Sequence, residues 1–154
     1  AVGIGAEMVE LDVQKTSDGA YVILHDKTLD RTTTCRGTVA ETTLDAVRAC
    51  HLVIEGTGEE TAEVVPTLEE AFKAIDGRIL MNVDIKLGVE ELANVMRIAA
   101  DRRADQLVIK NGTGTPDEIE AARATLQAIG APVLFMPILD DRKITKLADL
   151  AEKT

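Results

Sequence analysis

Two acidic side chains stand two residues apart in an apolar segment near the start of the chain. Glu10 and Asp12 alternate with Val9, Leu11 and Val13. Because successive side chains of a strand point to opposite faces, we expect both carboxylates on one face of a strand. Burying two such charges, about 7 Å apart, is expensive without a cation. The spacing therefore favours a divalent metal site with oxygen ligands, and the alternative is a pair of solvent-facing acids on an edge strand.

A third carboxylate and two lysines occur on later apolar segments. Asp84 and Lys86 share one face of the segment 79–87, and Lys110 ends the segment 106–110. We expect Asp84 to be a third metal ligand. The two lysines are expected either to neutralise a bound phosphate or to pair with the carboxylates.

His25 is the candidate proton-transfer residue, because it closes a predicted strand and is followed by Asp26. The unperturbed pKa of histidine is near neutral pH, which suits a general acid or base. The alternative is a structural histidine. We predict a structural role for His51, on a short amphipathic helix or at its end. Gly112, Thr113 and Gly114 precede a helix whose N-terminus suits an anion, but they form no complete phosphate-binding motif.

Short apolar runs alternate with amphipathic helical patterns along the chain. Strands are predicted at residues 8–13, 20–25, 79–87, 106–110 and 133–139. Helices are predicted at residues 43–49, 67–75, 89–103 and 116–129, and one more begins at 143. The Gly-containing residues 55–63 are predicted to form a loop. Thr67 and Glu70 have the spacing of a capping box at a helix start.

This alternation predicts an α/β fold with parallel strands joined by helical crossovers. A strand between two helix layers is apolar on both faces, whereas Asn82, Asp84 and Lys86 make one face of segment 79–87 polar. That pattern favours a (β/α) barrel, whose strands carry polar groups at their carboxyl ends, over a doubly wound sheet. Such a barrel typically needs about 250 residues, so we expect these 154 residues to be a partial barrel.

Composition restricts the possible partners. The net charge of −10 argues against a nucleic-acid surface, and a bound cation would reverse this field locally for a phosphate ester. The longest apolar runs are far shorter than the roughly 20 residues of a membrane helix, so no stable membrane insertion is expected. Cys35 and Cys50 are predicted to be free thiols, since neither belongs to a metal-binding or redox motif; a disulfide between them is the alternative in an oxidising compartment. The compartment and the oligomeric state stay open.

Several ordered segments closely resemble glycerophosphodiester phosphodiesterases, which belong to the superfamily of phospholipase C-like phosphodiesterases of lipid metabolism. They are GAEMVELDV at residues 5–13, the turn at Asp18 and Gly19, VILHD at 22–26, LDRTT at 29–33 and VPTLEEA at 65–71. The resemblance implies a (β/α)8 TIM barrel, of which residues 1–154 cover roughly strand 2 to the start of helix 5. It implies a single catalytic-domain segment, with residues 27–65 as a loop or insertion.

The resemblance also implies roles at individual positions. Glu10 and Asp12 stand where the family places metal ligands, and His25 stands where it places one of two catalytic histidines. Asp84 replaces what is commonly a glutamate ligand, so its carboxylate is one methylene shorter. Lys86 matches a lysine expected to neutralise the substrate phosphate, and Lys110 is a looser match. The expected cofactor is one divalent ion, Ca²⁺ or Mg²⁺.

The implied activity is metal-dependent hydrolysis of small glycerophosphodiesters to glycerol phosphate and an alcohol. The family's other catalytic histidine lies in a His-Arg-Gly segment, which these residues do not contain. One alternative is a related phospholipase D that acts on sphingomyelin or lysolipid headgroups. Another is a non-catalytic, barrel-derived module that binds a partner or a metal without turnover.

Overall fold

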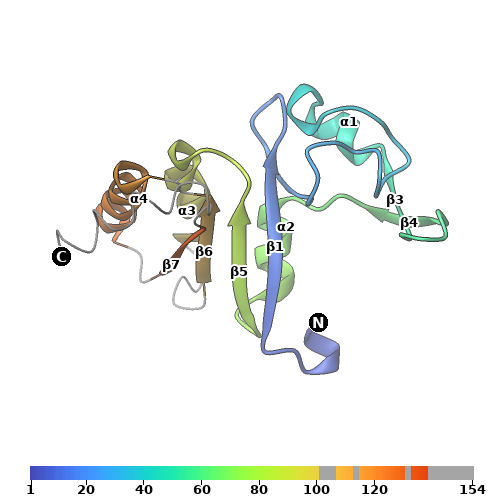
Figure 1. The fold of residues 1–154 in the computed structure, drawn as a ribbon. Coiled ribbons are helices and arrows are strands. Elements are labelled where there is room, and N and C mark those ends of the chain that lie inside the picture. Colours follow the sequence, from blue (N-terminus) through green and yellow to red (C-terminus); the bar gives the residue numbers. More distant parts are fainter. Residues whose placement is uncertain (101–106, 113–114, 131–132, 139–154) are drawn as a thin grey trace. The chain divides into compact units, whose positions relative to one another are not determined.

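The computed structural model describes residues 1–100, 107–112, 115–130 and 133–138. The chain divides into two compact units. The sheet unit contains Ala1–Glu10 and the chain from Ile75 onward, and the hairpin unit contains Leu11–Ala74. Strand β1 (Met8–Lys15) begins in the sheet unit and ends in the hairpin unit (Figure 1). Among the described residues, no helix has both the length and the apolar character to cross a membrane.

The sheet unit is built around parallel strands. The beginning of β1 is followed in the sheet by β5 (Leu80–Ile85), β6 (Leu107–Gly112) and β7 (Leu134–Ile138). β5 and β6 pair in parallel, as do β6 and β7. The backbone nitrogen of Leu80 donates to the Glu7 carbonyl at 2.9 Å, where β1 and β5 begin. These strands confirm the predicted α/β fold.

Helices connect the parallel strands, as parallel pairing requires. The chain from β5 to β6 contains the short 3₁₀ helix η3 (Val89–Glu91) and α3 (Leu92–Ala100), and α4 (Pro116–Ile129) precedes β7. A capping box of Thr115 and Glu118 starts α4, and Gly130 ends it at a φ of 68°. Left-handed backbone of this kind favours glycine. The predicted end of the helix at 89–103, and the whole helix predicted from 143, lie outside the described residues.

The two faces of the sheet differ in chemistry. Val83 and Ile109 are paired in register and fully buried. One residue further along the same ladder, Asp84 pairs with Lys110. Because paired residues of neighbouring strands share a face and successive residues alternate, these two polar side chains lie on the face opposite Val83 and Ile109. The polar face is therefore a consequence of register, as the barrel interpretation predicted.

In the hairpin unit, β2 (Tyr21–Ile23) runs antiparallel to the end of β1. The unit continues with η2 (Val39–Glu41), α1 (Leu44–Arg48), β3 (His51–Val53), β4 (Glu60–Val64) and α2, whose full span is Leu68–Ile75. The chain starts with one more 3₁₀ turn, η1 (Val2–Ile4), in the sheet unit. The core of the hairpin unit contains Val22, Leu24, Leu29, Val39, Val47, Cys50 and Val65. The stretch 27–65 thus contains regular elements and most of this core.

Two expectations for this stretch were wrong. Residues 55–63 were predicted to be a loop, but β4 begins at Glu60 and pairs antiparallel with β3. His51 was predicted on a helix or at its end, but it lies in β3. Both errors have one cause: β4 is short, mostly exposed and rich in Glu and Thr, so no apolar alternation marks it. Backbone pairing alone defines this strand.

The prediction of free thiols was also wrong, because Cys35 and Cys50 form a disulfide with their Cα atoms 5.6 Å apart. The residues beside them explain the approach. The Thr34 backbone nitrogen donates to the His51 carbonyl at 2.9 Å, and the His51 nitrogen donates to Thr34 Oγ1 at 3.1 Å. These contacts bring two cysteines that are 15 residues apart into bonding distance, which sequence spacing does not reveal.

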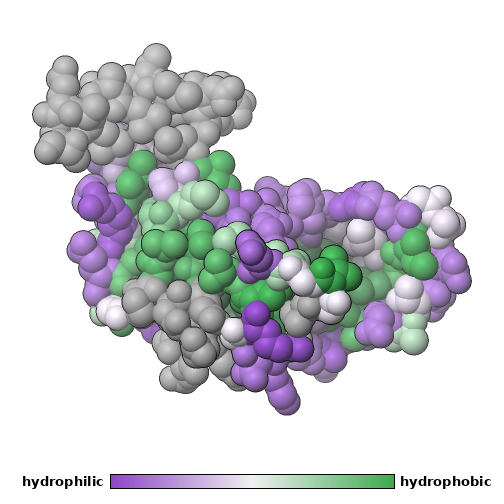
Figure 2. Space-filling model, turned by 90° about the horizontal axis from the view of Figure 1, so that it is seen from below, coloured by the Kyte–Doolittle hydropathy of each residue, from purple (hydrophilic) through white to green (hydrophobic). Residues whose placement is uncertain are grey.

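Exposed large apolar side chains occur at three places among the described residues of the sheet unit, and one of these places is Ile4 in η1. Met8 and Leu80 are exposed where β1 and β5 begin. Leu134, Met136 and Ile138 alternate along β7, the last strand of the sheet order, and are exposed too. Figure 2 shows the molecule from below and has apolar side chains on its surface among polar ones. The sheet unit thus presents apolar side chains that its described residues leave uncovered.

The capping box of α2 gives a direct test of the local account. Thr67 Oγ1 accepts from the Glu70 backbone nitrogen at 3.2 Å, and Glu70 Oε2 accepts from the Thr67 nitrogen at 2.9 Å. We expect Thr67→Ala to lower the free energy of unfolding by about 1 kcal/mol, measured by urea denaturation. Thr125→Ala is the control, since Thr125 only donates back to the Ala121 carbonyl within α4, and it should change stability by less than about 0.5 kcal/mol. Equal stability of Thr67→Ala and the unmodified chain would contradict the assignment.

Candidate metal centre

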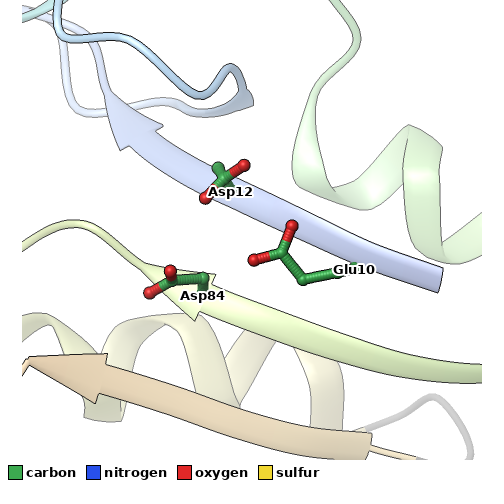
Figure 3. Close-up of side chains that lie close together, drawn as sticks. All are labelled: Glu10, Asp12 and Asp84. Atoms are coloured by element: carbon green, nitrogen blue, oxygen red, sulfur yellow. The ribbon is translucent and has the colours of Figure 1, made fainter. Parts of the chain in front are cut away.

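Three carboxylates converge at the strand pair β1 and β5. Glu10 and Asp12 lie two residues apart on β1, and Asp84 lies on β5. Each offers a carboxylate oxygen, and these oxygens all lie within 4.8 Å of one another (Figure 3). Asp84 is buried, with only 2% of its surface exposed, whereas Glu10 is exposed. The structure thus brings together the three residues that the sequence predicted as metal ligands.

Two lysines pair with two of the three carboxylates, Glu10 and Asp84. Lys110 Nζ lies 2.8 Å from Glu10 Oε1 and 3.0 Å from Asp84 Oδ2, and Lys86 Nζ lies 2.6 Å from the same Asp84 oxygen. The ladder register places Lys110 opposite Asp84. The pKa of the Lys110 ammonium is raised, first by its hydrogen bond to Glu10 and then by that to Asp84. Both lysines therefore lie close enough to meet a ligand bound at these acids.

The donor set fits a hard divalent cation. Three carboxylates and two ammonium groups leave one net negative charge, and each carboxylate has two oxygens. Ca²⁺ and Mg²⁺ prefer oxygen ligands, and carboxylates from separate strands supply them. A cation here would replace the ammonium groups as the partner of the acids. The lysines would then be available to an anion.

His25 follows β2 in the hairpin unit. The Leu24 backbone nitrogen donates to the Asp12 carbonyl at 3.0 Å, so the residue before His25 is held against β1. The buried Gln14 side chain donates to the His25 carbonyl at 3.1 Å. The His25 ring is 66% exposed, and its Nδ1 lies 2.7 Å from Asp26 Oδ1. The backbone of this histidine is therefore fixed, while its ring is accessible to solvent.

Sequence reasoning named Asp26 beside His25 but missed Gln14 and Arg31, two further polar residues that position this histidine. Gln14 holds its backbone, Asp26 holds its ring, and Arg31 in turn holds Asp26. Asp26 and Arg31 belong to the segments VILHD and LDRTT, so motif position marked them without giving their roles. His51 has the structural contacts expected of it, because its Nδ1 lies 3.0 Å from the Thr61 carbonyl. Thr113 and Gly114 of the weak anion motif lie outside the described residues.

Fold and site together define a class of protein: an α/β barrel-type domain with a carboxylate site on the polar face of its strands. Comparison with known proteins names the family. The model of the glycerophosphoryl diester phosphodiesterase family matches residues 1–128. The chain belongs to this family.

Curated relatives match somewhat more than half of the chain. A glycerophosphodiester phosphodiesterase of Caldanaerobacter subterraneus subsp. tengcongensis is 41% identical over 90 residues, which are 58% of this chain and 37% of the relative. One from Bacillus altitudinis is 36% identical over 91 residues, 56% of this chain and 36% of the relative. The matched region is thus little more than a third of each of these relatives.

Solved structures show the same fold. An Oleispira antarctica phosphodiesterase in complex with the product sn-glycerol-3-phosphate superposes with a TM-score of 0.71 at 20% identity, covering 99% of this chain and 62% of that one. A glycerophosphodiester phosphodiesterase from Agrobacterium tumefaciens gives 0.68 at 24% identity, covering 84% of this chain and 53% of that one. The chain therefore has the fold of part of a (β/α)8 TIM barrel.

The contacts of Lys110 generate a prediction about cation affinity. A divalent ion must displace or approach this ammonium, so replacing it with a neutral side chain should favour the ion. We expect Lys110→Gln to raise Mg²⁺ or Ca²⁺ affinity roughly tenfold, as one unit charge about 5 Å away implies, measured by isothermal titration calorimetry. Lys73→Gln on α2 is the control and should leave affinity within about twofold, because surface charges are screened by salt. Weaker cation binding in Lys110→Gln would contradict this electrostatic account.

Proposed function

We propose that this protein is a metal-dependent phosphodiesterase that hydrolyses glycerophosphodiesters to glycerol phosphate and an alcohol. The observation that carries the proposal is the convergence of Glu10, Asp12 and Asp84 at one point of the strand pair. Family membership supports it, as do the names of the curated relatives and the glycerol phosphate product bound to the Oleispira protein. The substrate is a small phosphodiester, and the net charge of −10 argues against nucleic acid.

In this proposal Glu10, Asp12 and Asp84 hold one divalent ion, Ca²⁺ or Mg²⁺. When bound, such an ion stabilises negative charge on the phosphodiester oxygens in the transition state. Asp84 has a shorter side chain than glutamate, but it is buried and fixed by Lys86 and Lys110. Its oxygens therefore have a defined position without the extra methylene.

The two lysines act on the substrate phosphate. Lys86 Nζ and Lys110 Nζ both contact Asp84 Oδ2, so their charges lie at the same carboxylate. Lys110 is 18% exposed and Lys86 is 31% exposed, which leaves each head group partly accessible. In this role they bind the non-bridging phosphate oxygens and compensate the charge that develops during the reaction.

His25 transfers the proton. A water molecule forms the new oxygen–phosphorus bond while the bond from phosphorus to the alcohol oxygen breaks. On the alternative route the 2-hydroxyl of the substrate glycerol displaces the alcohol, and water then opens the resulting cyclic phosphate to glycerol phosphate. The nucleophile loses a proton and the leaving oxygen gains one. His25 serves as the base or the acid in this exchange, since its ring is exposed and its Nδ1 is held by Asp26. A second group must complete the exchange. The family's other catalytic histidine lies in a His-Arg-Gly segment, which residues 1–154 do not contain.

The test is release of sn-glycerol 3-phosphate from glycerophosphocholine or glycerophosphoethanolamine, measured on the natural polypeptide with Mg²⁺ or Ca²⁺. We expect EDTA to abolish activity and added metal to restore it. We expect His25→Ala to lower kcat at least about 100-fold, because acid–base catalysis contributes about 10² to 10⁴.

His51→Ala is the matched control, since His51 contacts the Thr61 carbonyl in the β3–β4 hairpin. It should retain activity within a few-fold. Full activity of His25→Ala would remove the assigned role of that histidine. Hydrolysis that persists in EDTA would instead refute metal dependence, and binding of the cation without any turnover would support the non-catalytic alternative.

A further inference from the structure

One carboxylate joins His25 to an arginine in the hairpin unit. Asp26 Oδ1 lies 2.7 Å from His25 Nδ1. The same carboxylate accepts two hydrogen bonds from Arg31, from Nε to Oδ2 at 2.6 Å and from Nη2 to Oδ1 at 3.0 Å. Both carboxylate oxygens of Asp26 therefore accept hydrogen bonds, and one edge of the Arg31 guanidinium forms a bidentate pair with them.

The protonation of Asp26 determines which ring nitrogen of His25 carries hydrogen. The pKa of the Asp26 carboxyl is lowered far below its usual range, first by Arg31 and then by His25. An ionised carboxylate only accepts hydrogen bonds. His25 Nδ1 must therefore donate, which leaves Nε2 as the nitrogen that can take up or release a proton.

Arg31 is itself held on its other side. Its Nη1 lies 2.9 Å from Glu55 Oε1, and the pKa of the guanidinium is raised by Asp26 first and Glu55 second. A planar guanidinium that binds two carboxylates has a fixed orientation, which a flexible lysine ammonium would not impose. The orientation of Asp26 is thus determined from outside the His25 contact.

The backbone around Arg31 is rigidly paired. Thr32, the next residue, accepts at its carbonyl from the Val53 nitrogen at 3.0 Å, and Thr33 forms a bridge with Leu52. Thr33 is buried and its hydroxyl donates to the Leu29 carbonyl at 2.7 Å. Residues 32–34 are thus paired with residues 51–53, and Arg31 and Glu55 both lie just beyond the same end of this pair. The Cys35–Cys50 disulfide closes its other end.

We propose that Arg31 is a positioning residue that holds Asp26, and through it keeps His25 in the Nδ1-protonated tautomer with Nε2 available for proton transfer. The catalytic part of this inference rests on the proposed function of His25. The positioning part rests on the contacts alone, so the two can be tested separately.

The decisive measurement is the ring-nitrogen NMR spectrum of the 154-residue chain at alkaline pH. The chain has two histidines, so His51 serves as an internal reference. We expect His25 in the unmodified chain to be protonated at Nδ1. In Arg31→Gln its population should shift toward the Nε2-protonated form, while His51 stays unchanged. Arg31→Lys keeps the positive charge but loses the bidentate geometry of the guanidinium. It should give a population of the Nδ1-protonated form between those of the unmodified chain and Arg31→Gln.

Kinetics on the natural polypeptide give the second readout. We expect Arg31→Gln to lower kcat about tenfold, part of the 10² to 10⁴ that acid–base catalysis supplies, with little change in KM. Arg36→Gln is the matched control, because Arg36 is 87% exposed and lies 3.7 Å from Asp30. It should alter neither the tautomer nor kcat.

Two outcomes separate the inference from the proposed function. An unchanged His25 tautomer in Arg31→Gln overturns the positioning role, whatever the enzyme activity. A shifted tautomer in a protein that does not hydrolyse phosphodiesters upholds the positioning role and refutes the proposed function instead. Thermal unfolding of each variant ensures that the spectra compare folded proteins.

Discussion

A buried carboxylate needs compensation, and Asp84 is the clearest case among the residues that the structure describes. It is 2% exposed, and two ammonium groups lie within 3.0 Å of its Oδ2 atom. Transfer of an unpaired carboxylate from water to a protein interior would cost several kcal/mol. Glu10 and Asp12 add two further carboxylates at the same place. The three carboxylates thus concentrate negative charge at one place, and positive charge from ammonium groups or a bound cation must compensate it.

The register of the strands creates this concentration. Parallel pairing of β5 and β6 sets Asp84 opposite Lys110, and alternation along β1 brings Glu10 and Asp12 to one face. A shift of one residue in either strand would turn these side chains to the face where Val83 and Ile109 are buried. Burial of the apolar face therefore fixes the position of the polar one. Core packing and the chemistry of the site share one cause.

Local sequence signals predicted much of this arrangement. The alternation around Glu10 predicted β1 and the common direction of its two acids, and the pairs Thr67–Glu70 and Pro116–Gly130 marked helix ends that the structure confirms. Each of these signals involves residues that are close together in the sequence, so the sequence alone is enough to recognise it. The convergence of Asp84 with β1 required the barrel interpretation as well.

Contacts that no local sequence signal marks escaped prediction. Strand β4 has no apolar alternation, and the Cys35–Cys50 bond depends on pairing between Thr34 and His51. The contact of Arg31 with Asp26 spans five residues of irregular backbone, for which no periodicity applies. Resemblance to the family marked those positions, but only coordinates show which atoms meet.

Locating a bound cation tests the central claim most directly. Crystals of the protein grown with Mn²⁺ would give an anomalous signal at each metal position. The account predicts one strong peak within about 2.6 Å of carboxylate oxygens from Glu10, Asp12 and Asp84, with the Lys110 ammonium moved away from Glu10. A peak bound elsewhere, with Glu10 and Asp84 still paired to Lys86 and Lys110, would contradict it.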